Sequence, residues 1–219
     1  GQVTVARLPL YRVPWVNEGP VLMGRNGRPR TKVTLPGHNA GVKPANHGLT
    51  FPADPPTSDE ILRILDACSD TPVGIRNRAL FTVLWRSGLR ISEALALKPH
   101  HVDFDARTVT VMSGKGGKRR TSGIDVPAPA EVSRWLWERA RLPIDQVRAP
   151  LFCTVQRPGV GNEINSAAVR RRLHELAAVA RVPRRVAPHQ LRHAQAVELA
   201  RERTPVRLIQ LQLGHSSLA

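Results

Sequence analysis

Residues 87–97 read Ser-Gly-Leu-Arg-Ile-Ser-Glu-Ala-Leu-Ala-Leu and join two segments with the apolar periodicity of helices. The first helix is predicted over about residues 75–87 and ends at Gly88, because glycine readily takes the left-handed conformation of a helix C-terminus. The second is predicted over residues 91–97 and stops before a proline. Arg90 therefore lies just past a helix-ending glycine. The large apolar side chains of this region are assigned to the core: Phe81, Leu84, Trp85, Leu95 and Leu97.

Capping residues and apolar stripes predict further helices along the chain. Thr57 and Glu60 have the spacing of a capping box, which opens a helix that ends at Asp66 or Cys68. We expect its inner face to carry Ile61, Leu62, Leu65 and Cys68. The others are predicted over residues 130–141, from Asn165 or Ser166 to Ala180, over residues 189–201, and over residues 205–213 before Gly214.

Two segments between these helices have the pattern of β-strands. Residues 108–112 are Thr-Val-Thr-Val-Met, and a second strand is predicted around residues 122–126. Residues 113–118, Ser-Gly-Lys-Gly-Gly-Lys, separate them as a Gly-rich hairpin tip. The sequence from residue 55 onward thus predicts an α+β domain that is mainly helical and has a small antiparallel sheet.

Residues 1–54 are rich in Gly and Pro, and they predict a basic arm or linker with a short strand near residues 3–10. The whole chain has a formal net charge of +16, with 33 Lys and Arg against 17 Asp and Glu. Such a surplus repels itself unless a polyanion neutralises it, and nucleic acid is the commonest such partner. Aromatic residues make up only 4% of the chain, too few for a platform that stacks single-stranded bases. Double-stranded DNA is the favoured partner.

The sequence also excludes several classes of protein. It has no apolar run long enough for a membrane span, and its first residues lack the apolar core of a secretory signal. Two cysteines exclude a disulfide scaffold and favour a reducing, cytoplasmic compartment. His189 and His193 stand four residues apart, but Gln190 occupies the place of a zinc protease's catalytic glutamate, so no metal or other cofactor is expected.

Five cationic or imidazole residues near element ends stand out as candidates for chemistry: Arg90, Lys115, His189, Arg192 and His215. Taken alone, each has a simpler explanation. Arg90 can pair with Glu93 on a helix surface, and Lys115 can keep a hairpin tip hydrated. His215 can interact with the dipole at a helix C-terminus.

Together we expect these residues to form a cage that suits one phosphate. Arg90 and Arg192 would neutralise the charge on a pentavalent phosphorus through bidentate hydrogen bonds. Lys115 would protonate the departing 5′-oxygen. His189 would take or relay the nucleophile's proton, and His215 would donate to a phosphate oxygen.

At these residues the sequence resembles the tyrosine recombinase, or phage integrase, family. The matching motifs are Ser-Gly-Leu-Arg-Ile-Ser-Glu, Gly-Lys-Gly-Gly-Lys, His-Gln-Leu-Arg-His and Leu-Gly-His-Ser-Ser, in the family's order over about residues 55–219. The resemblance implies a catalytic domain that cuts DNA without a metal, through a covalent 3′-phosphotyrosine. It implies catalytic roles for the five candidates, a bracing role for Glu93 and a structural one for His193.

The resemblance also implies a tyrosine nucleophile about nine residues past the Leu-Gly-His motif. The only tyrosine is Tyr11, in the N-terminal arm. We therefore expect the catalytic domain of residues 55–219 to be truncated before its nucleophile, which would lie beyond Ala219, and the chain to bind DNA without cleaving it. Because family members act as tetramers on two duplexes, we expect a homotetramer on DNA for the full-length protein and a monomer for this chain.

Three other functions remain open. One is a catalytically inactive DNA-binding or regulatory protein derived from the recombinase fold, which the presence or absence of the tyrosine would distinguish. A basic RNA-binding protein would explain the charge but not the order of the five residues. A metal-dependent nuclease would lose its activity in the presence of a chelator.

Overall fold

The structure is a computed structural model that describes residue 41, residues 54–112 and residues 119–214. The chain divides into two compact units, residues 1–52 and 53–219, and all of the described helices and strands belong to the second. The predicted hairpin tip over residues 113–118 and the predicted strand near residues 3–10 lie outside the described residues.

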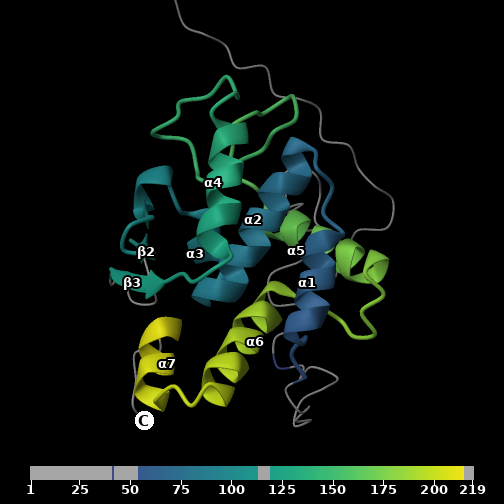
Figure 1. Ribbon diagram of the computed structural model, residues 1–219. Helices are drawn as coiled ribbons and strands as arrows, with labels where there is room; N and C mark the ends of the chain where they lie inside the picture. Colours follow the sequence, from purple (N-terminus) through teal and green to yellow (C-terminus); the bar gives the residue numbers. More distant parts are fainter. Residues whose placement is uncertain (1–40, 42–53, 113–118, 215–219) are drawn as a thin grey trace, which may run out of the picture. The chain divides into compact units, whose positions relative to one another are not determined.

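The second unit is mainly helical and carries one small antiparallel sheet, as the sequence predicted (Figure 1). Its elements are α1 (Ser58–Asp66), α2 (Pro72–Ser87), α3 (Ile91–Leu95), the 3-10 helix η2 (Pro99–His101), β1 (Val102–Asp103), β2 (Thr108–Val111), β3 (Arg120–Gly123), α4 (Ala128–Arg139), α5 (Ser166–Val179), α6 (Pro188–Arg201) and α7 (Val206–Leu213).

Helix α2 is the centre of the core. It packs most extensively against α4 and α6, while α1 packs against α5. Leu80 and Leu84 of α2, Trp135 of α4 and Leu173 of α5 are all fully buried. Each large apolar side chain of this kind contributes roughly 1.5–3 kcal/mol to folding when it leaves water. A central helix that is covered along its length gives rigid support to the residues at its two ends.

The helix-capping signals in the sequence are confirmed. The Thr57 hydroxyl accepts from the Glu60 N–H at 3.3 Å, and the Glu60 carboxylate accepts from the Thr57 N–H at 2.8 Å. The Asn165 side chain caps α5. Gly88 and Gly214, with φ of 61° and 66°, end α2 and α7 in the left-handed conformation. Local hydrogen-bonding chemistry therefore sets these helix ends, and it is readable from sequence.

Some predicted boundaries and orientations were wrong. Helix α2 begins at Pro72, not near residue 75, because the Thr71 side chain accepts a hydrogen bond from Gly74 and proline fits the first helical turn. Leu62 was expected to face inward, but it is 42% exposed, and Ile64 occupies the buried position instead. Helix α3 ends at Leu95, two residues earlier than predicted, and α4 spans residues 128–139 where 130–141 had been predicted.

The sheet has the strand order β1-β2-β3, and both pairs are antiparallel. Val109 pairs with Ser122 and Thr110 with Thr121. The second strand of the hairpin was predicted around residues 122–126, but β3 runs over Arg120–Gly123. The predicted bounds were wrong because β3 shows no alternation of hydrophobic and polar residues. Its inward positions hold Arg120, which is half-buried, and Ser122, which is fully buried. Strand β1 has only two residues and carried no signal in the sequence.

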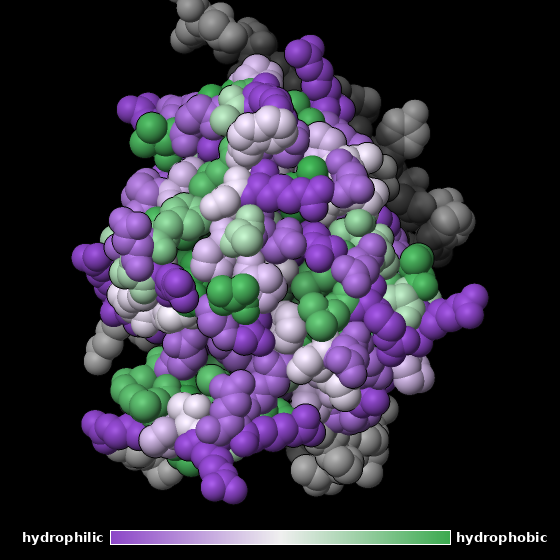
Figure 2. Space-filling model, viewed as in Figure 1, coloured by the Kyte–Doolittle hydropathy of each residue, from purple (hydrophilic) through white to green (hydrophobic). Residues whose placement is uncertain are grey.

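Helix α7 is less completely covered than the other helices of the core. Val206, Leu208 and Leu211 are exposed, while Ile209 and Leu213 face inward. Figure 2 shows mostly hydrophilic residues on this face of the molecule, with a hydrophobic patch where Figure 1 places α7. The polar contacts that α7 makes with β3 therefore help to hold this helix in place. In the part of the chain that the structure describes, no helix is long and apolar enough to cross a bilayer.

Candidate phosphate-binding site

The turn between α2 and α3 lies where α6 and α7 meet it. Gly88 leaves no room for a side chain there, since a Cβ would come within 2.6 Å of both the Gln195 Oε1 and the Leu213 Cδ2 atoms. Leu89 is buried next to it. The next residue, Arg90, is the N-cap of α3, and its side chain is 37% exposed. The fold thus presents one accessible guanidinium from a rigid turn.

Glu93 braces this arginine from the first turn of α3. Its carboxylate accepts hydrogen bonds from the Arg90 backbone N–H at 2.8 Å and from the Arg90 Nη1 at 3.0 Å. The Arg120 Nη2 donates to the same carboxylate at 2.8 Å. Burial alone would raise the pKa of Glu93, but the Arg90 backbone N–H and the charges of Arg120 and Arg90 outweigh it and lower the pKa. The ion pair with Arg90 that the sequence suggested is therefore present, and it is part of a larger cluster.

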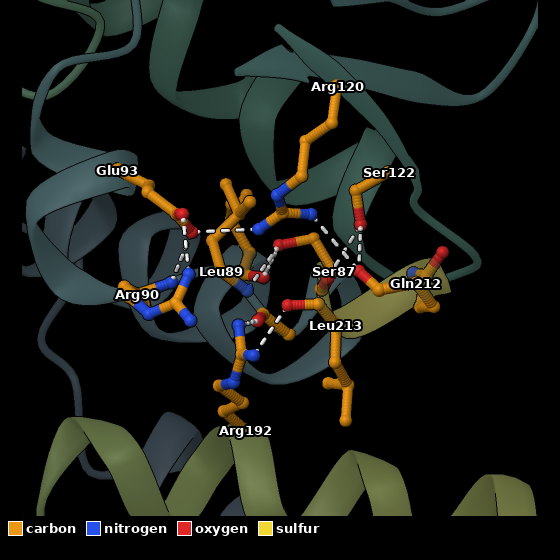
Figure 3. Close-up of polar contacts among 11 residues, drawn as sticks. Ser87, Leu89, Arg90, Glu93, Arg120, Ser122, Arg192, Gln212 and Leu213 are labelled. Atoms are coloured by element: carbon orange, nitrogen blue, oxygen red, sulfur yellow. Dashed lines mark hydrogen bonds and ion pairs between the residues drawn. The ribbon is translucent and has the colours of Figure 1, made fainter. Parts of the chain in front are cut away.

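Arg192 lies on α6 and is only 8% exposed. Its Nη1 donates to the carbonyl of Gly88, and its Nη2 donates to the carbonyl of Leu213, so one guanidinium joins the C-terminal ends of α2 and α7 (Figure 3). A cation is favoured at both places, because unpaired carbonyls make helix C-termini partly negative. Burial, and then the positive charge of Arg90, lower the pKa of Arg192 to about 10. Arg90 and Arg192, far apart in sequence, are thus close in space.

Arg120 and Gln212 are members of the same cluster that the sequence did not identify. The Arg120 Nη1 donates to the Gln212 carbonyl at 3.1 Å, and the Ser122 hydroxyl donates to the Ser87 carbonyl at 2.7 Å. Figure 3 shows Arg90, Arg120 and Arg192 grouped around the turn that follows α2. The partners of Arg120 are distant in sequence, so no local motif could reveal them.

His189 and His193 lie on α6 and are both exposed, with ring centroids 6.1 Å apart. Burial, followed by the charges of His193, Arg185 and Arg170, lowers the pKa of His189. Among the hydrogen bonds of residues 54–112 and 119–214, none joins either imidazole to Arg90 or Arg192. The structure therefore brings Arg90, Glu93 and Arg192 together through direct contacts, and it places His189 three residues before Arg192 on the same helix.

The remaining predicted site residues, Lys115 and His215, lie outside the described residues. Where the structure describes the chain, no three His, Cys, Asp or Glu side chains are grouped as metal ligands. The cluster itself holds three guanidinium groups and one carboxylate, which leaves two positive charges. Guanidinium groups bind phosphate oxygens through paired N–H donors, so this arrangement suits a phosphate group.

The fold has counterparts among solved recombinases. The crystal structure of XerA recombinase matches with a TM-score of 0.66 and 28% identity over 78% of this chain and 59% of that one. A pre-cleavage complex of XerH recombinase with its difH substrate matches with a TM-score of 0.62 and 27% identity over 74% of this chain and 47% of that one. The described fold is that of a tyrosine recombinase catalytic domain.

Comparison of the amino-acid sequence with known proteins indicates the same class of protein. The family described as "Phage integrase family" matches residues 57–219, and the chain belongs to this family. It is 34% identical to the tyrosine recombinase XerC of Xanthomonas campestris pv. campestris (strain B100), over 74% of this chain and 48% of the relative. It is 32% identical to the tyrosine recombinase XerD of Mycobacterium leprae (strain TN), over 81% of this chain and 57% of the relative. The chain thus spans about half the length of the curated relatives it matches, and the predicted resemblance is confirmed.

Proposed function

We propose that this chain supplies the phosphate-binding core of a site-specific DNA recombinase, in which Arg90 and Arg192 bind the phosphate that is cut. The observation that carries the proposal is their convergence: two guanidinium groups from α3 and α6 meet at one turn, and a buried Glu93 orients the more exposed of them. Arg192 uses two N–H groups on backbone carbonyls, so the same guanidinium has further donors for phosphate oxygens.

The reaction that this assignment supports is transfer of a phosphoryl group to a tyrosine. Arg90 and Arg192 neutralise the charge that grows on the non-bridging oxygens. The tyrosine oxygen bonds to phosphorus as the bond to the 5′-oxygen breaks, and Lys115 protonates that oxygen. His189 accepts the tyrosine's proton, a role that needs a neutral imidazole, and the lowered pKa of His189 favours that neutral form. His215 donates a hydrogen bond to a phosphate oxygen. The products are a 3′-phosphotyrosine and a 5′-hydroxyl.

Residues 57–219 contain no tyrosine, since the single one in the chain is Tyr11. We therefore propose that the polypeptide of residues 1–219 binds duplex DNA and does not cleave it. A C-terminal segment that carries a tyrosine is expected to allow covalent trapping of DNA, and a Tyr→Phe change in that segment is expected to abolish it. If the extended protein binds DNA but never forms the covalent product, the inactive regulatory function is the correct one.

The assembly is part of the same proposal. We expect residues 1–219 to be a monomer in solution, and we expect the complete recombinase to act in the cytoplasm as a homotetramer on two duplexes. The DNA-bound XerH structure, at 27% identity, supports DNA as the partner. Light scattering of the purified chain tests the first expectation, which a stable tetramer without DNA would overturn.

A binding experiment tests the phosphate site directly. A duplex is selected from a randomised DNA library by its binding to residues 1–219, and each phosphate is then replaced in turn by a neutral methylphosphonate. Arg90→Gln and Arg192→Gln should each weaken binding roughly ten-fold, as expected for a lost charge-assisted hydrogen bond. The loss should disappear when one particular phosphate has been neutralised. Equal losses on the neutralised duplex, or a preference for RNA of the same sequence, would count against the proposal.

A further inference from the structure

We propose that Arg120, on β3, is a positioning residue that neutralises Glu93, so that Glu93 can orient Arg90 without cancelling the charge that Arg90 offers to phosphate. The inference rests on the proposed function of Arg90. The sequence motifs do not contain Arg120, and its assignment comes from the contacts of its guanidinium with α3 and α7.

Two hydrogen bonds hold the guanidinium of Arg120 in place. Its Nη2 donates to Glu93 at 2.8 Å, and its Nη1 donates to the carbonyl of Gln212 at 3.1 Å. Its Nε is buried and has no hydrogen-bond partner among residues 54–112 and 119–214. A Cβ on Gly214 would lie 2.5 Å from this atom, so only glycine leaves room for it. Only 15% of the side chain is exposed.

The electrostatic argument follows from the shared carboxylate. Glu93 is nearly fully buried, with 4% of its side chain exposed, and it accepts from both Arg90 and Arg120. With a single arginine, Glu93 and Arg90 would form a neutral pair, and a phosphate would compete with the carboxylate for the same N–H groups. With Arg120 present, the trio of Arg90, Arg120 and Glu93 keeps one positive charge. Attraction to phosphate is stronger here than in bulk water, because the site is partly buried.

Arginine suits this role better than lysine. The planar guanidinium donates in two fixed directions, one toward the carboxylate and one toward the Gln212 carbonyl. A lysine would keep the charge but lose the fixed pair of directions. Because the Gln212 carbonyl belongs to the last turn of α7, the same guanidinium also links β3 to the helix end that precedes Gly214.

The test measures DNA binding by residues 1–219 with the selected duplex. Arg120→Gln should weaken binding roughly ten-fold, as expected for one lost charge-assisted contact. Arg120→Lys should recover part of the affinity. The double variant Arg120→Gln with Glu93→Gln should bind more tightly than Arg120→Gln alone, because it restores the two positive charges of the cluster. A structural role alone predicts the opposite order, since the double variant removes more of the network.

A matched control separates charge from folding. Arg86 has a side chain 16% exposed and pairs with the carboxylates of Asp125 and Glu198, so it resembles Arg120 in burial and pairing but lies outside the cluster. Arg86→Gln should lower the thermal midpoint comparably and leave DNA affinity within two-fold, as roughly expected of a charge that makes no phosphate contact.

Two results overturn the inference: equal affinities for Arg120→Gln and Arg86→Gln, or a double variant that binds more weakly than Arg120→Gln. These are distinct from failure of the proposed function, which would appear in the unmodified chain as binding that no single methylphosphonate weakens. If Arg120→Gln fails to fold, Arg120→Lys decides the matter: with an intact fold, an affinity clearly above that of Arg90→Gln supports the charge role, and an affinity as low as that of Arg90→Gln opposes it.

Discussion

Glu93 is a buried carboxylate whose charge the fold stabilises. Burial favours its neutral form, whereas the Arg90 N–H, Arg120 and the Arg90 side chain favour the ionised form and lower its pKa. A carboxyl group with a lowered pKa stabilises the folded state above the pKa that it has in the unfolded chain. That contribution is lost as the pH falls through the folded-state pKa.

We therefore expect the Glu93→Gln variant to lose unfolding free energy in a pH-dependent way. The deficit relative to the unmodified chain should be largest at neutral pH and should shrink as the pH falls below about 4.3, the ordinary value for Glu. Urea denaturation at a series of pH values measures it. A deficit that stays constant from neutral to acid pH would contradict the assigned ionisation of Glu93.

Partial burial, followed by the positive charges of His193, Arg185 and Arg170, lowers the pKa of His189. The Arg185→Gln variant should raise the pKa of His189, because it removes one repelling charge. Arg171→Gln is the matched control, since Arg171 is an exposed arginine next to Arg170 and is not among the charges that lower the pKa of His189. Titration of the imidazole chemical shifts by NMR tests the difference, and equal shifts in the two variants would refute it.

At the scale of elements, the hydrogen bonds between β3 and α7 converge on one residue, Gln212. The Gln212 Oε1 accepts from the Gly123 N–H at 3.0 Å, and its Nε2 donates to the Gly123 carbonyl at 2.7 Å. The side-chain amide of Gln212 thus accepts from and donates to the backbone of Gly123, as the backbone of an adjacent strand would. Its own carbonyl accepts from Arg120 and Ser122. Helix α7, exposed along one face, is attached to the sheet through this residue.

Gln212→Ala is expected to reduce the free energy of unfolding by about 1–2 kcal/mol, because it removes two hydrogen bonds and leaves the Gly123 groups unpaired. Amide exchange at Gly123 should become faster, while exchange in α2 should change only through global stability. Gln210→Ala, on the same helix, is the control, and it should change stability by less than half as much. Indistinguishable results for the two variants would show that the paired contact does not hold α7.

Much of this architecture could be predicted from the sequence because it depends on local chemistry. The capping box at Thr57, the glycines that end α2 and α7, and the apolar stripes of the helices each act within a few residues. Arg120 and Gln212 could not be found this way, since their partners lie 27 to 92 residues away. The strand β3 was predicted, but its bounds were misplaced, because hydrophobic alternation cannot report the inward arginine and serine near its start.

At the scale of the whole molecule, the net charge of +16 and the arginine cluster act over different distances. The overall charge attracts any polyanion, and salt screens it within about 10 Å at moderate ionic strength. The cluster at the ends of α2 and α7 acts only on a phosphate that docks there. The two contributions to DNA binding can therefore be separated by their dependence on salt.

Binding of residues 1–219 to the selected duplex should weaken steeply with salt, with a log–log slope of roughly 0.9 for each phosphate neutralised. Arg90→Gln should reduce that slope by roughly 0.9, because it removes one phosphate contact. Arg86→Gln should leave the slope unchanged, since two carboxylates already neutralise that guanidinium. Anisotropy titrations across a range of salt concentrations measure all three slopes. A flat salt dependence in the unmodified chain would show that its surplus charge does not act on DNA, and an unchanged slope in Arg90→Gln would place the bound phosphate away from α3.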